Sequence, residues 1–412
     1  MRFTIIFILI YTLSQGQNKT CYSEDHSYEI HYMETTSFFD GSKIKDYHVD
    51  DVVYKKKGVK YYVLADFKKG RSINAKTFGV VADGVTDDTK SLQSALNAAS
   101  KFGFTLILPY GTMITSGDLI LDLSKSRNGF TLRGSGVANT VIKNIGNSTK
   151  NALLITGSYF NNLDVRDFRI ERDLASPVPT GENGLVIEKQ VYASLENIEV
   201  IRFMKGVVMK DVSSAYLKGV NARFCSKGFY FHRGENGVSN PNLIALHSCV
   251  LTSNDEWGVT IVNGHSVNIQ SSLFESNLQG GINFSFDATN GGNSINLSGS
   301  YFEGNKGVDV FLKASAAGSH NFIGNTFNRV DDKQYTNHNI FMDLNTINTL
   351  SSTHMVNLIG NSFFVANNYK SSPLRKAVSI ISDNLEKVII HDTSFYKDIL
   401  DKPDYPAIHL LK

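Results

Sequence analysis

Two glutamates, Glu275 and Glu303, carry the strongest chemical signal in the sequence. They occur in the similar strings Phe-Glu-Ser-Asn and Phe-Glu-Gly-Asn. Cleavage of a glycosidic bond by either hydrolytic geometry needs two carboxyl groups, one protonated and one ionised. A glutamate that only closes a turn is the structural alternative. We expect these two residues to be the catalytic pair.

Five further residues could contact a sugar chain near this pair. Trp257 is the only tryptophan, and an exposed indole offers a flat surface on which a sugar ring can stack. Asp255 and Glu256 precede it, and they either join Glu275 in a groove lined by carboxylates or form a solvated turn. Arg223 and His265 are basic candidates. We expect all five to bind substrate, with a core-facing tryptophan under a loop as the alternative for Trp257.

Eliminative cleavage beside a uronate would need different chemistry. It needs a base for the C5 proton and a cation beside the carboxylate, either calcium held by Asp and Glu or an Arg or Lys side chain. His232 and Arg233 join Arg223 and His265 as basic candidates for such a reaction. The sequence contains no complete calcium-binding set and no Cys/His spacing typical of zinc. We therefore expect no metal site and no cofactor, with calcium required only if the protein is a lyase.

The elements that must position these residues follow from an internal repeat. The pattern is an apolar residue, two variable residues, a small or apolar residue, one variable residue and a usually large apolar residue. Its nine occurrences begin at Val165, Leu195, Leu217, Leu246, Ile269, Leu297, Phe322, Leu358 and Ile390. Successive starts are 22 to 36 residues apart. Short period-2 strands in such a unit cannot bury their own apolar face, so stacked coils are predicted.

The variable spacing favours a parallel β-helix over other repeat folds. A leucine-rich repeat needs a regular Leu/Asn consensus, and a propeller needs longer and evenly spaced blades, and neither pattern is present. In a β-helix the loops can lengthen without disturbing the stacked strands. A column of Asn254, Asn277 and Asn305 supports this register, because stacked asparagines can hydrogen-bond along the axis.

Aligning the coils places Glu275 and Glu303 at one outward position on neighbouring coils. The column reads Arg223, Thr252, Glu275, Glu303 and Asn328. Coils of a β-helix lie about 4.8 Å apart. That separation is closer to the 5–5.5 Å of a retaining carboxylate pair than to an inverting one. Two like charges at this distance disfavour simultaneous ionisation, so one group is expected to hold a proton.

The N-terminal part of the chain divides into three predicted segments. Residues 1–17 combine a basic start, an apolar run and small polar residues, the anatomy of a secretory signal peptide. Residues 18–72 form a leader or cap with short strands, and residues 73–412 form the β-helix domain. Thr89 begins a helical stretch that Asp87 or Asp88 can cap. Such a helix would cover the first coil.

Composition narrows the class of partner. The net charge is +2, hydrophobic residues make up 42% and charged residues 19%, which argues against a nucleic-acid partner. After the signal peptide no apolar stretch reaches the length of a membrane span. Three cysteines provide no disulfide framework, and Cys249 reads as a small core residue. A secreted, extracellular or periplasmic protein is the expectation.

One string is specific enough to point to a family. Residues 78–89 read FGVVADGVTDDT, and this segment resembles the entry motif of the pectate lyase superfamily, including phage tailspike-type polysaccharide depolymerases. The resemblance implies an all-β, right-handed, single-stranded parallel β-helix solenoid with a short N-terminal capping helix. It also implies turn and cap roles for Asp83, Asp87 and Asp88, a polysaccharide substrate and a homotrimer.

These observations predict a secreted enzyme that degrades a polysaccharide in a groove along the solenoid. The enzyme would be an endo-glycosidase or a polysaccharide lyase. A non-catalytic glycan-binding surface protein or adhesin is the alternative, because the fold alone does not choose a chemistry.

Overall fold

The protein is described by a computed structural model. The described residues are 52–57, 60–65, 72–102, 105–124, 129–158, 162–173, 182–234, 237, 240–285, 294–314, 318–329, 338–345, 353–365, 376–396 and 408–411. The predicted signal peptide and Cys21 lie outside them. Within the predicted leader, β1 (Val52–Lys57) pairs antiparallel with β2 (Lys60–Ala65), as the apolar residues there suggested.

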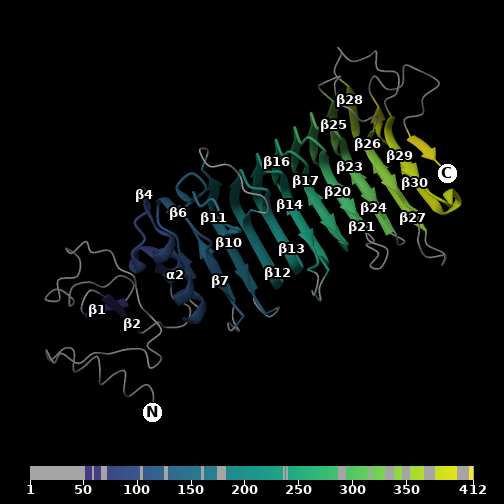
Figure 1. Ribbon diagram of the computed structural model, residues 1–412. Coiled ribbons are helices and arrows are strands. Elements are labelled where there is room, and N and C mark those ends of the chain that lie inside the picture. Colours follow the sequence, from purple (N-terminus) through teal and green to yellow (C-terminus); the bar gives the residue numbers. More distant parts are fainter. Residues whose placement is uncertain are drawn as a thin grey trace.

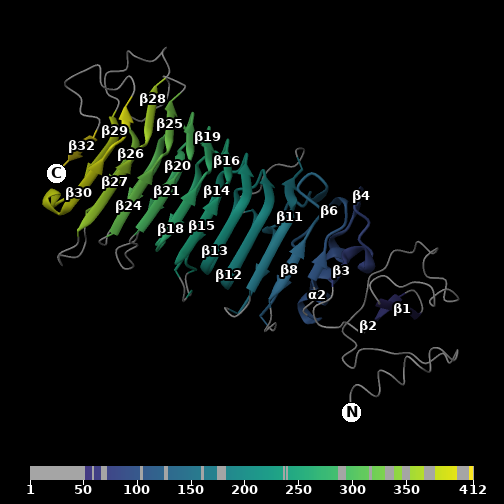
Figure 2. The same ribbon diagram turned by 180° about the vertical axis from the view of Figure 1, so that it is seen from behind.

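From Ser72 onward the chain winds into a parallel β-helix. Consecutive strands lie on three faces, which we name A, B and C in the order in which the chain follows them. The coils advance along one axis from the N-terminal helix to the last strands (Figures 1 and 2). Each inner strand pairs in parallel with the strand one coil earlier and one coil later, and the strands at the two ends of the solenoid pair on one side. The predicted β-helix is therefore confirmed.

Three strands, β11 (Asn162–Arg172), β12 (Asn183–Ile201) and β13 (Lys205–Arg223), bend around more than one face, and the others belong to one face each. Face A consists of β7 (Ile120–Asp122), β10 (Asn151–Thr156), the starts of β12 and β13, β14 (Lys227–His232), β17 (Trp257–Val262), β20 (Gly280–Ser285), β23 (Val308–Lys313), β26 (His338–Asp343), β29 (Lys376–Ile381) and β32 (Ile408–Leu411).

Faces B and C continue each coil. Face B consists of β3 (Ser72–Asn74), β5 (Thr105–Ile107), β8 (Phe130–Arg133), the start of β11, the middles of β12 and β13, β15 (Leu243–His247), β18 (Val267–Gln270), β21 (Ser294–Ser298), β24 (Gly318–Ile323), β27 (His354–Ile359) and β30 (Val388–Asp392). Face C consists of β4 (Asp83–Asp87), β6 (Gly111–Thr115), β9 (Thr140–Asn144), the ends of β11, β12 and β13, β16 (Val250–Thr252), β19 (Leu273–Glu275), β22 (Tyr301–Glu303), β25 (Thr326–Arg329), β28 (Ser362–Val365) and β31 (Phe395–Tyr396).

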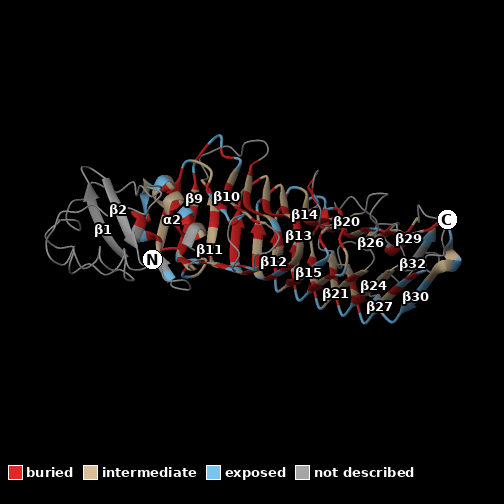
Figure 3. Cartoon of the chain, turned by 90° about the horizontal axis from the view of Figure 1, so that it is seen from below, coloured by how far each residue is buried: buried red, intermediate tan, exposed pale blue. Residues whose placement is uncertain are grey.

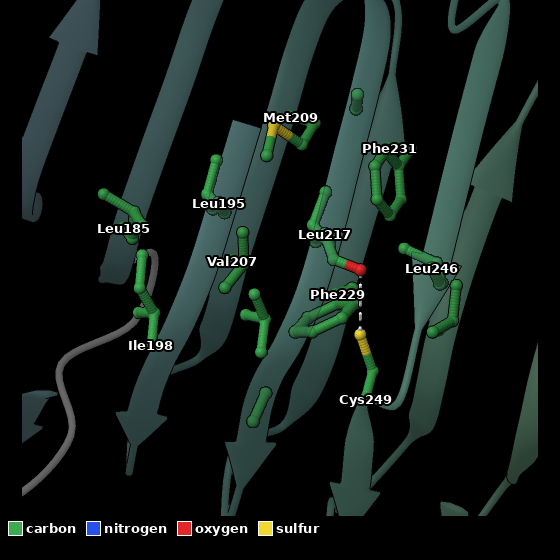
Figure 4. Packing of buried hydrophobic residues seen from close by; sticks show 14 of the residues in the cluster. Leu185, Leu195, Ile198, Val207, Met209, Leu217, Phe229, Phe231, Leu246 and Cys249 are labelled. Carbon is green, nitrogen blue, oxygen red and sulfur yellow. Dashed lines mark hydrogen bonds between the residues drawn. The ribbon is translucent and has the colours of Figure 1, made fainter. Parts of the chain in front are cut away.

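The repeated apolar residues form the core. Leu195, Leu217 and Leu246 pair in register on successive strands of face B and are buried (Figure 4). On face C, Phe274 and Phe302 stack with ring centroids 4.8 Å apart, close to the rise of one coil. Buried positions recur in the coils along the solenoid (Figure 3). Because one coil cannot exclude water from both sides of its apolar layer, stacking supplies the burial.

Left-handed residues turn the chain from face B to face C. The residue directly before the fourth position of the repeat has a positive φ in eight coils, and these residues are Asp167, Asn197, Gly219, Ser248, Ser271, Gly299, Gly324 and Gly360. Glycine and short polar side chains tolerate this conformation best. The sequence of the repeat therefore specifies the corner between face B and face C.

The ninth repeat is an exception, and its predicted register is wrong. Ile390 pairs with Val356 instead of Leu358, and Phe395 pairs with Ser362 instead of Phe363. Phe395 is 58% exposed instead of buried. The shift of two residues at Ile390 keeps the same side chains facing inward, so an alternating pattern cannot distinguish the two registers of that strand. The shift of one residue at Phe395 turns its ring outward.

The predicted capping helix is α2 (Thr89–Phe102), which occupies the place of a face A strand in the first coil. Gln93 pairs with the edge of β7, donating to the Ile120 carbonyl at 2.7 Å and accepting from the Ile120 N–H at 2.8 Å. Two short 3-10 helices, η2 (Ala75–Phe78) and η4 (Leu385–Lys387), complete the described helices.

The aspartates before α2 have the expected turn and cap roles. Asp83 accepts the N–H groups of Val85 and Thr86, and Asp87 accepts that of Thr89. Asp88 is buried and turns back to accept the N–H groups of residues 81 and 82 at 2.7 and 3.0 Å. These bonds fix the loop that leads into the helix.

Candidate functional site

Glu275 and Glu303 lie at one corner of the solenoid, where face C passes into face A. We call this edge corner CA. The two residues are direct partners in the pairing of β19 with β22, and both are half-buried on the outer side of face C. The Cα positions are therefore one coil apart, about 4.8 Å. The predicted stacking of the two glutamates is present.

Asn328 orients one member of the pair. Its Nδ2 donates to Glu303 Oε1 at 3.3 Å and to the Tyr301 hydroxyl at 3.0 Å. Asn328 follows Glu303 in the same column, one coil further along the axis. Glu303 is thus held from one side, and Glu275 faces it from the other.

Arg223 belongs to the same column but is engaged elsewhere. Thr252 separates it from Glu275, so the two residues are two coils apart. Its Nη2 lies 2.8 Å from Glu199 Oε1. Arg169 Nη1 also lies near Glu199, at 3.6 Å. Arg223 therefore contributes to an ion-pair network beside the glutamates instead of pairing with them.

A buried asparagine ladder holds corner CA in place. Asn254 Nδ2 donates to Asn277 Oδ1 at 2.8 Å, and Asn277 Nδ2 donates to Asn305 Oδ1 at 2.9 Å. Asn305 Nδ2 donates to Asp309 Oδ1 at 3.0 Å. The structural role predicted for the three asparagines is confirmed. Because Glu275 and Glu303 stand two residues before Asn277 and Asn305, the ladder fixes their spacing.

Three of the predicted binding residues meet at the same corner. Asp255 is exposed, whereas Glu256 forms an ion pair in which its Oε2 lies 2.9 Å from Lys227 Nζ. Trp257 is half-buried at the start of β17. The residues come from the coil next to that of Glu275, so the corner combines carboxylates with an aromatic ring.

The ring of Trp257 lies across Gly280, its pairing partner on the next coil. A Cβ atom on Gly280 would come within 2.4 Å of this ring and 2.1 Å of the Val308 carbonyl oxygen, so glycine is required there. Beyond Gly280 the indole contacts Phe311, with centroids 6.4 Å apart, and Phe311 stacks on Phe341 at 5.8 Å. An aromatic row therefore runs along the outside of face A.

His265 lies apart from this group. It is in the turn between β17 and β18, where face A passes into face B. Strand β17 separates it from corner CA, and six residues of strand span about 16 Å. His232 and Arg233 lie at the same far edge, where Arg233 Nε donates to the Gly237 carbonyl at 2.6 Å. Of the basic candidates, only Arg223 shares face C with the glutamates.

Within the described ranges, no group of three or more His, Cys, Asp or Glu side chains is placed to hold a metal ion. The same part of the chain contains no helix that is long and apolar enough to cross a membrane. Cys225 and Cys249 are free and buried, and burial raises the pKa of their thiols to about 11 and 12.

A hollow on face B was not predicted from the sequence. It has a volume of about 500 Å³, and its lining includes Tyr192, Tyr216, Leu243 and Asp164. These residues stand one or three positions before the start of the repeat in their coils. Extending the alignment of coils three residues upstream would have revealed two outward tyrosines on neighbouring strands.

The stacked coils, the Asp-rich entry turn and the capping helix define a β-helix of the pectate lyase type. The family described as "Rhamnogalacturonase A/epimerase, pectate lyase-like" matches residues 72–283, and the chain belongs to this family.

Curated relatives match shorter stretches. A capsule KN3-specific depolymerase of Klebsiella phage KN3-1 is 32% identical over 150 residues, covering 32% of this chain and 18% of the relative. The mannuronan C5-epimerase AlgE4 of Azotobacter vinelandii is 36% identical over 108 residues, covering 24% of this chain and 19% of the enzyme. The preneck appendage protein of Bacillus phage PZA is 27% identical over 213 residues, covering 50% of this chain and 23% of that protein. The matches thus span less than a quarter of each relative's length.

Solved structures agree on the fold. Tailspike protein 2 of bacteriophage CBA120 has a TM-score of 0.56 at 13% identity, covering 82% of this chain and 51% of the tailspike. The gp42 tailspike of Acinetobacter phage vb_AbaP_AS12 has a TM-score of 0.52 at 12% identity, covering 80% and 61%. At such identities the likeness concerns the architecture alone.

Proposed function

We propose that this protein is a secreted enzyme that cleaves a polysaccharide at corner CA, with Glu275 and Glu303 as its catalytic pair. The observation that carries the proposal is their direct pairing on β19 and β22. Two outward carboxylates on neighbouring coils stand at about the separation that a retaining glycosidase uses. The relatives named as a capsule depolymerase and a mannuronan epimerase support a polysaccharide as the substrate class.

The two glutamates take complementary roles in this proposal. One carboxyl group protonates the leaving oxygen of the glycosidic bond, and the other attacks the anomeric carbon. Water then hydrolyses the glycosyl-enzyme ester, with the first group acting as base. Glu303 acts as the nucleophile, because the hydrogen bond from Asn328 orients its carboxylate, and Glu275 acts as the acid.

Trp257 and the neighbouring acids supply binding. The indole offers a stacking surface beside the carboxylates, and Asp255 can accept hydroxyl groups of the sugar at the exposed edge of the corner. Arg223, tied to Glu199, keeps a positive charge on face C two coils away. His265 lies across face A, so it contacts only a long substrate.

Binding without cleavage is the second candidate. The aromatic row of Trp257, Phe311 and Phe341 favours it, because such a row can hold a glycan without any acid or base. In that case the protein is a glycan-binding surface protein, and the glutamates are dispensable.

A panel of polysaccharides tests the proposal. The wild type, Glu275→Gln and Glu303→Gln are incubated with each polymer, and reducing ends and the absorbance of unsaturated uronates are followed. We expect reducing ends from the wild type and a loss of at least about 1000-fold in each variant, because each role needs its own carboxyl group. Glu171→Gln is the matched control, since Glu171 occupies the same outward column four coils earlier.

The outcomes separate the candidates. Full activity in both variants contradicts the site, and a gain in absorbance from unsaturated uronates means elimination instead of hydrolysis. Tight binding to a polymer without any product supports the surface protein. Thermal midpoints within a few degrees of the wild type show that the variants are folded.

A further inference from the structure

The hollow on face B lies away from the glutamates. It is formed by the outer surfaces of β8, β11, β12, β13 and β15, which follow one another along the axis in Figure 2. Its floor consists of small or buried residues such as Ala193 and Ala215. Face B is separated from face C by a full corner, so the hollow and the Glu275–Glu303 pair open in different directions.

Two tyrosines form the walls of the hollow. Tyr192 is 59% exposed and Tyr216 is 45% exposed. Tyr192 pairs with Ser214 and Tyr216 pairs with Ser194, so the two rings are diagonal neighbours on adjacent strands. Such neighbours lie about 7 Å apart, a distance that aromatic side chains can bridge. Leu243, which pairs with Ser214 on the next coil, adds apolar surface that is 49% exposed.

Polar groups are interleaved with this apolar surface. Asp164, Ser194 and Ser214 line the hollow, together with Thr131 and Asn162. Hydroxyl, amide and carboxylate groups of this kind exchange hydrogen bonds with the hydroxyls of a sugar. A mostly apolar hollow with a few convergent polar groups is typical of a small-ligand site.

The charges around the hollow are already paired. Arg166 Nη2 lies 3.2 Å from Asp164 Oδ2, and Arg133 Nε lies 3.6 Å from Asp167 Oδ2. In the same outward column, Lys218 donates to Glu196 at 2.7 Å. The three cations and three anions cancel, and each cation has a carboxylate partner. A uronate would have to compete with these carboxylates, whereas a neutral sugar would not.

We propose that this hollow binds a neutral oligosaccharide, stacked on Tyr192 and Tyr216 and hydrogen-bonded to Asp164 and the neighbouring hydroxyls. The site holds a chain without cutting it, because its single carboxylate is tied to Arg166 and has no partner in the hollow to act as a second catalytic group. It is therefore a binding site additional to corner CA, and it does not depend on the role proposed for the glutamates.

Calorimetric titration of the full chain tests this site. The probes are gluco-, xylo-, manno- and galacto-hexasaccharides as neutral ligands and hexagalacturonate as the uronate. We expect at least one neutral probe to bind. Tyr192→Ala and Tyr216→Ala should each weaken that binding about five- to tenfold, the size of one lost aromatic contact. Tyr192→Phe keeps the ring and should retain most of the affinity.

Two control variants separate this site from the rest of the molecule. Tyr110→Ala removes a tyrosine that is 71% exposed outside the hollow and should bind as the wild type does. Phe395→Ala, which removes a ring that is 58% exposed on face C in the last coil, should also bind normally, which distinguishes the hollow from other exposed aromatic rings. The proposal is overturned if no neutral probe binds, if both tyrosine variants bind as the wild type does, or if hexagalacturonate binds more tightly than every neutral probe. Circular dichroism verifies that each variant is folded.

Discussion

The imidazole rings of His320 and His354 stack inside the core of the solenoid, with their centroids 5.5 Å apart. His320 Nε2 and His354 Nδ1 are 3.3 Å apart, while His320 Nδ1 and His354 Nε2 have no hydrogen-bond partner among the described residues. Burial lowers the pKa of His320 from 6.5 to about 3 and also lowers the pKa of His354. Both rings are therefore neutral in the folded protein.

This pair makes the stability of the protein depend on pH. The unfolded chain binds protons at both histidines below pH 6.5, but the folded chain does not until about pH 3 at His320. The contribution of this pair to stability is therefore complete above pH 6.5 and falls as the pH drops, by about 1.4 kcal/mol per pH unit for His320 down to about pH 3, and protonation of His354 in the unfolded chain adds to the fall. Urea denaturation at pH 7 and pH 5 measures the slope.

His320→Phe isolates this effect. Phenylalanine keeps an aromatic ring in the stack but cannot bind a proton, so the variant should lose less stability than the wild type between pH 7 and pH 5. The comparison is needed because burial raises the pKa of Glu182 from 4.5 to about 7, which gives the opposite slope in this range. Parallel pH profiles for the wild type and the variant would contradict the prediction.

The asparagine ladder should contribute strongly to stability. Asn277→Ala removes the donor to the Leu251 carbonyl at 2.9 Å and the bonds to Asn254 and Asn305, all of them buried. We expect the free energy of unfolding to fall by at least about 3 kcal/mol, because buried partners are left unsatisfied. Asn296→Ala is the control. Its bonds to Asn268 and Asn321 are only partly buried, so water can replace them, and the loss should stay below about 1 kcal/mol. Equal losses would show that corner CA does not depend on the ladder.

The single tryptophan reports on corner CA directly. Gly280→Ala places a methyl group against the ring of Trp257 and the backbone of Val308, so the indole must move off Phe311. We expect red-shifted fluorescence and a stability loss of about 1–3 kcal/mol. Phe341→Ala is the control because Phe341 stacks on Phe311 and is one coil further from the indole. An unchanged emission spectrum in Gly280→Ala would mean that the ring does not lie over residue 280.

Most of the fold could be predicted from the repeat, because each apolar position of the repeat has to be buried in the core. The repeat positions that Leu217 and Phe274 occupy in their coils must face inward, and the residue before the fourth position must accept a left-handed conformation. The last coil does not follow this rule of buried apolar positions. Strand β30 is covered on one side only, so several of its positions are exposed and its register is set by pairing instead of burial.

The candidate site was predictable only where it coincides with the repeat. Glu275 and Glu303 follow a core position directly, so aligning the coils placed them together. His265 could not be placed this way, because its distance from the glutamates depends on which corner a turn occupies. Tyr192 and Tyr216 lie before the pattern begins, and nothing in their local sequence marks a hollow. The hollow arises only from the way in which residues of neighbouring coils lie side by side.

Because each coil of the solenoid has the same rise, the number of coils between two sites sets their distance along the axis. Tyr216 lies in the coil of β13 and Glu275 two coils further along, so about 10 Å along the axis separates the hollow on face B from the Glu275–Glu303 pair. Inserting or removing one whole coil would change that offset by a single fixed step without opening the core. If the proposed catalytic pair and the proposed binding hollow act on one glycan, the number of coils between them would set the length of the product, while each local structure stays as it is.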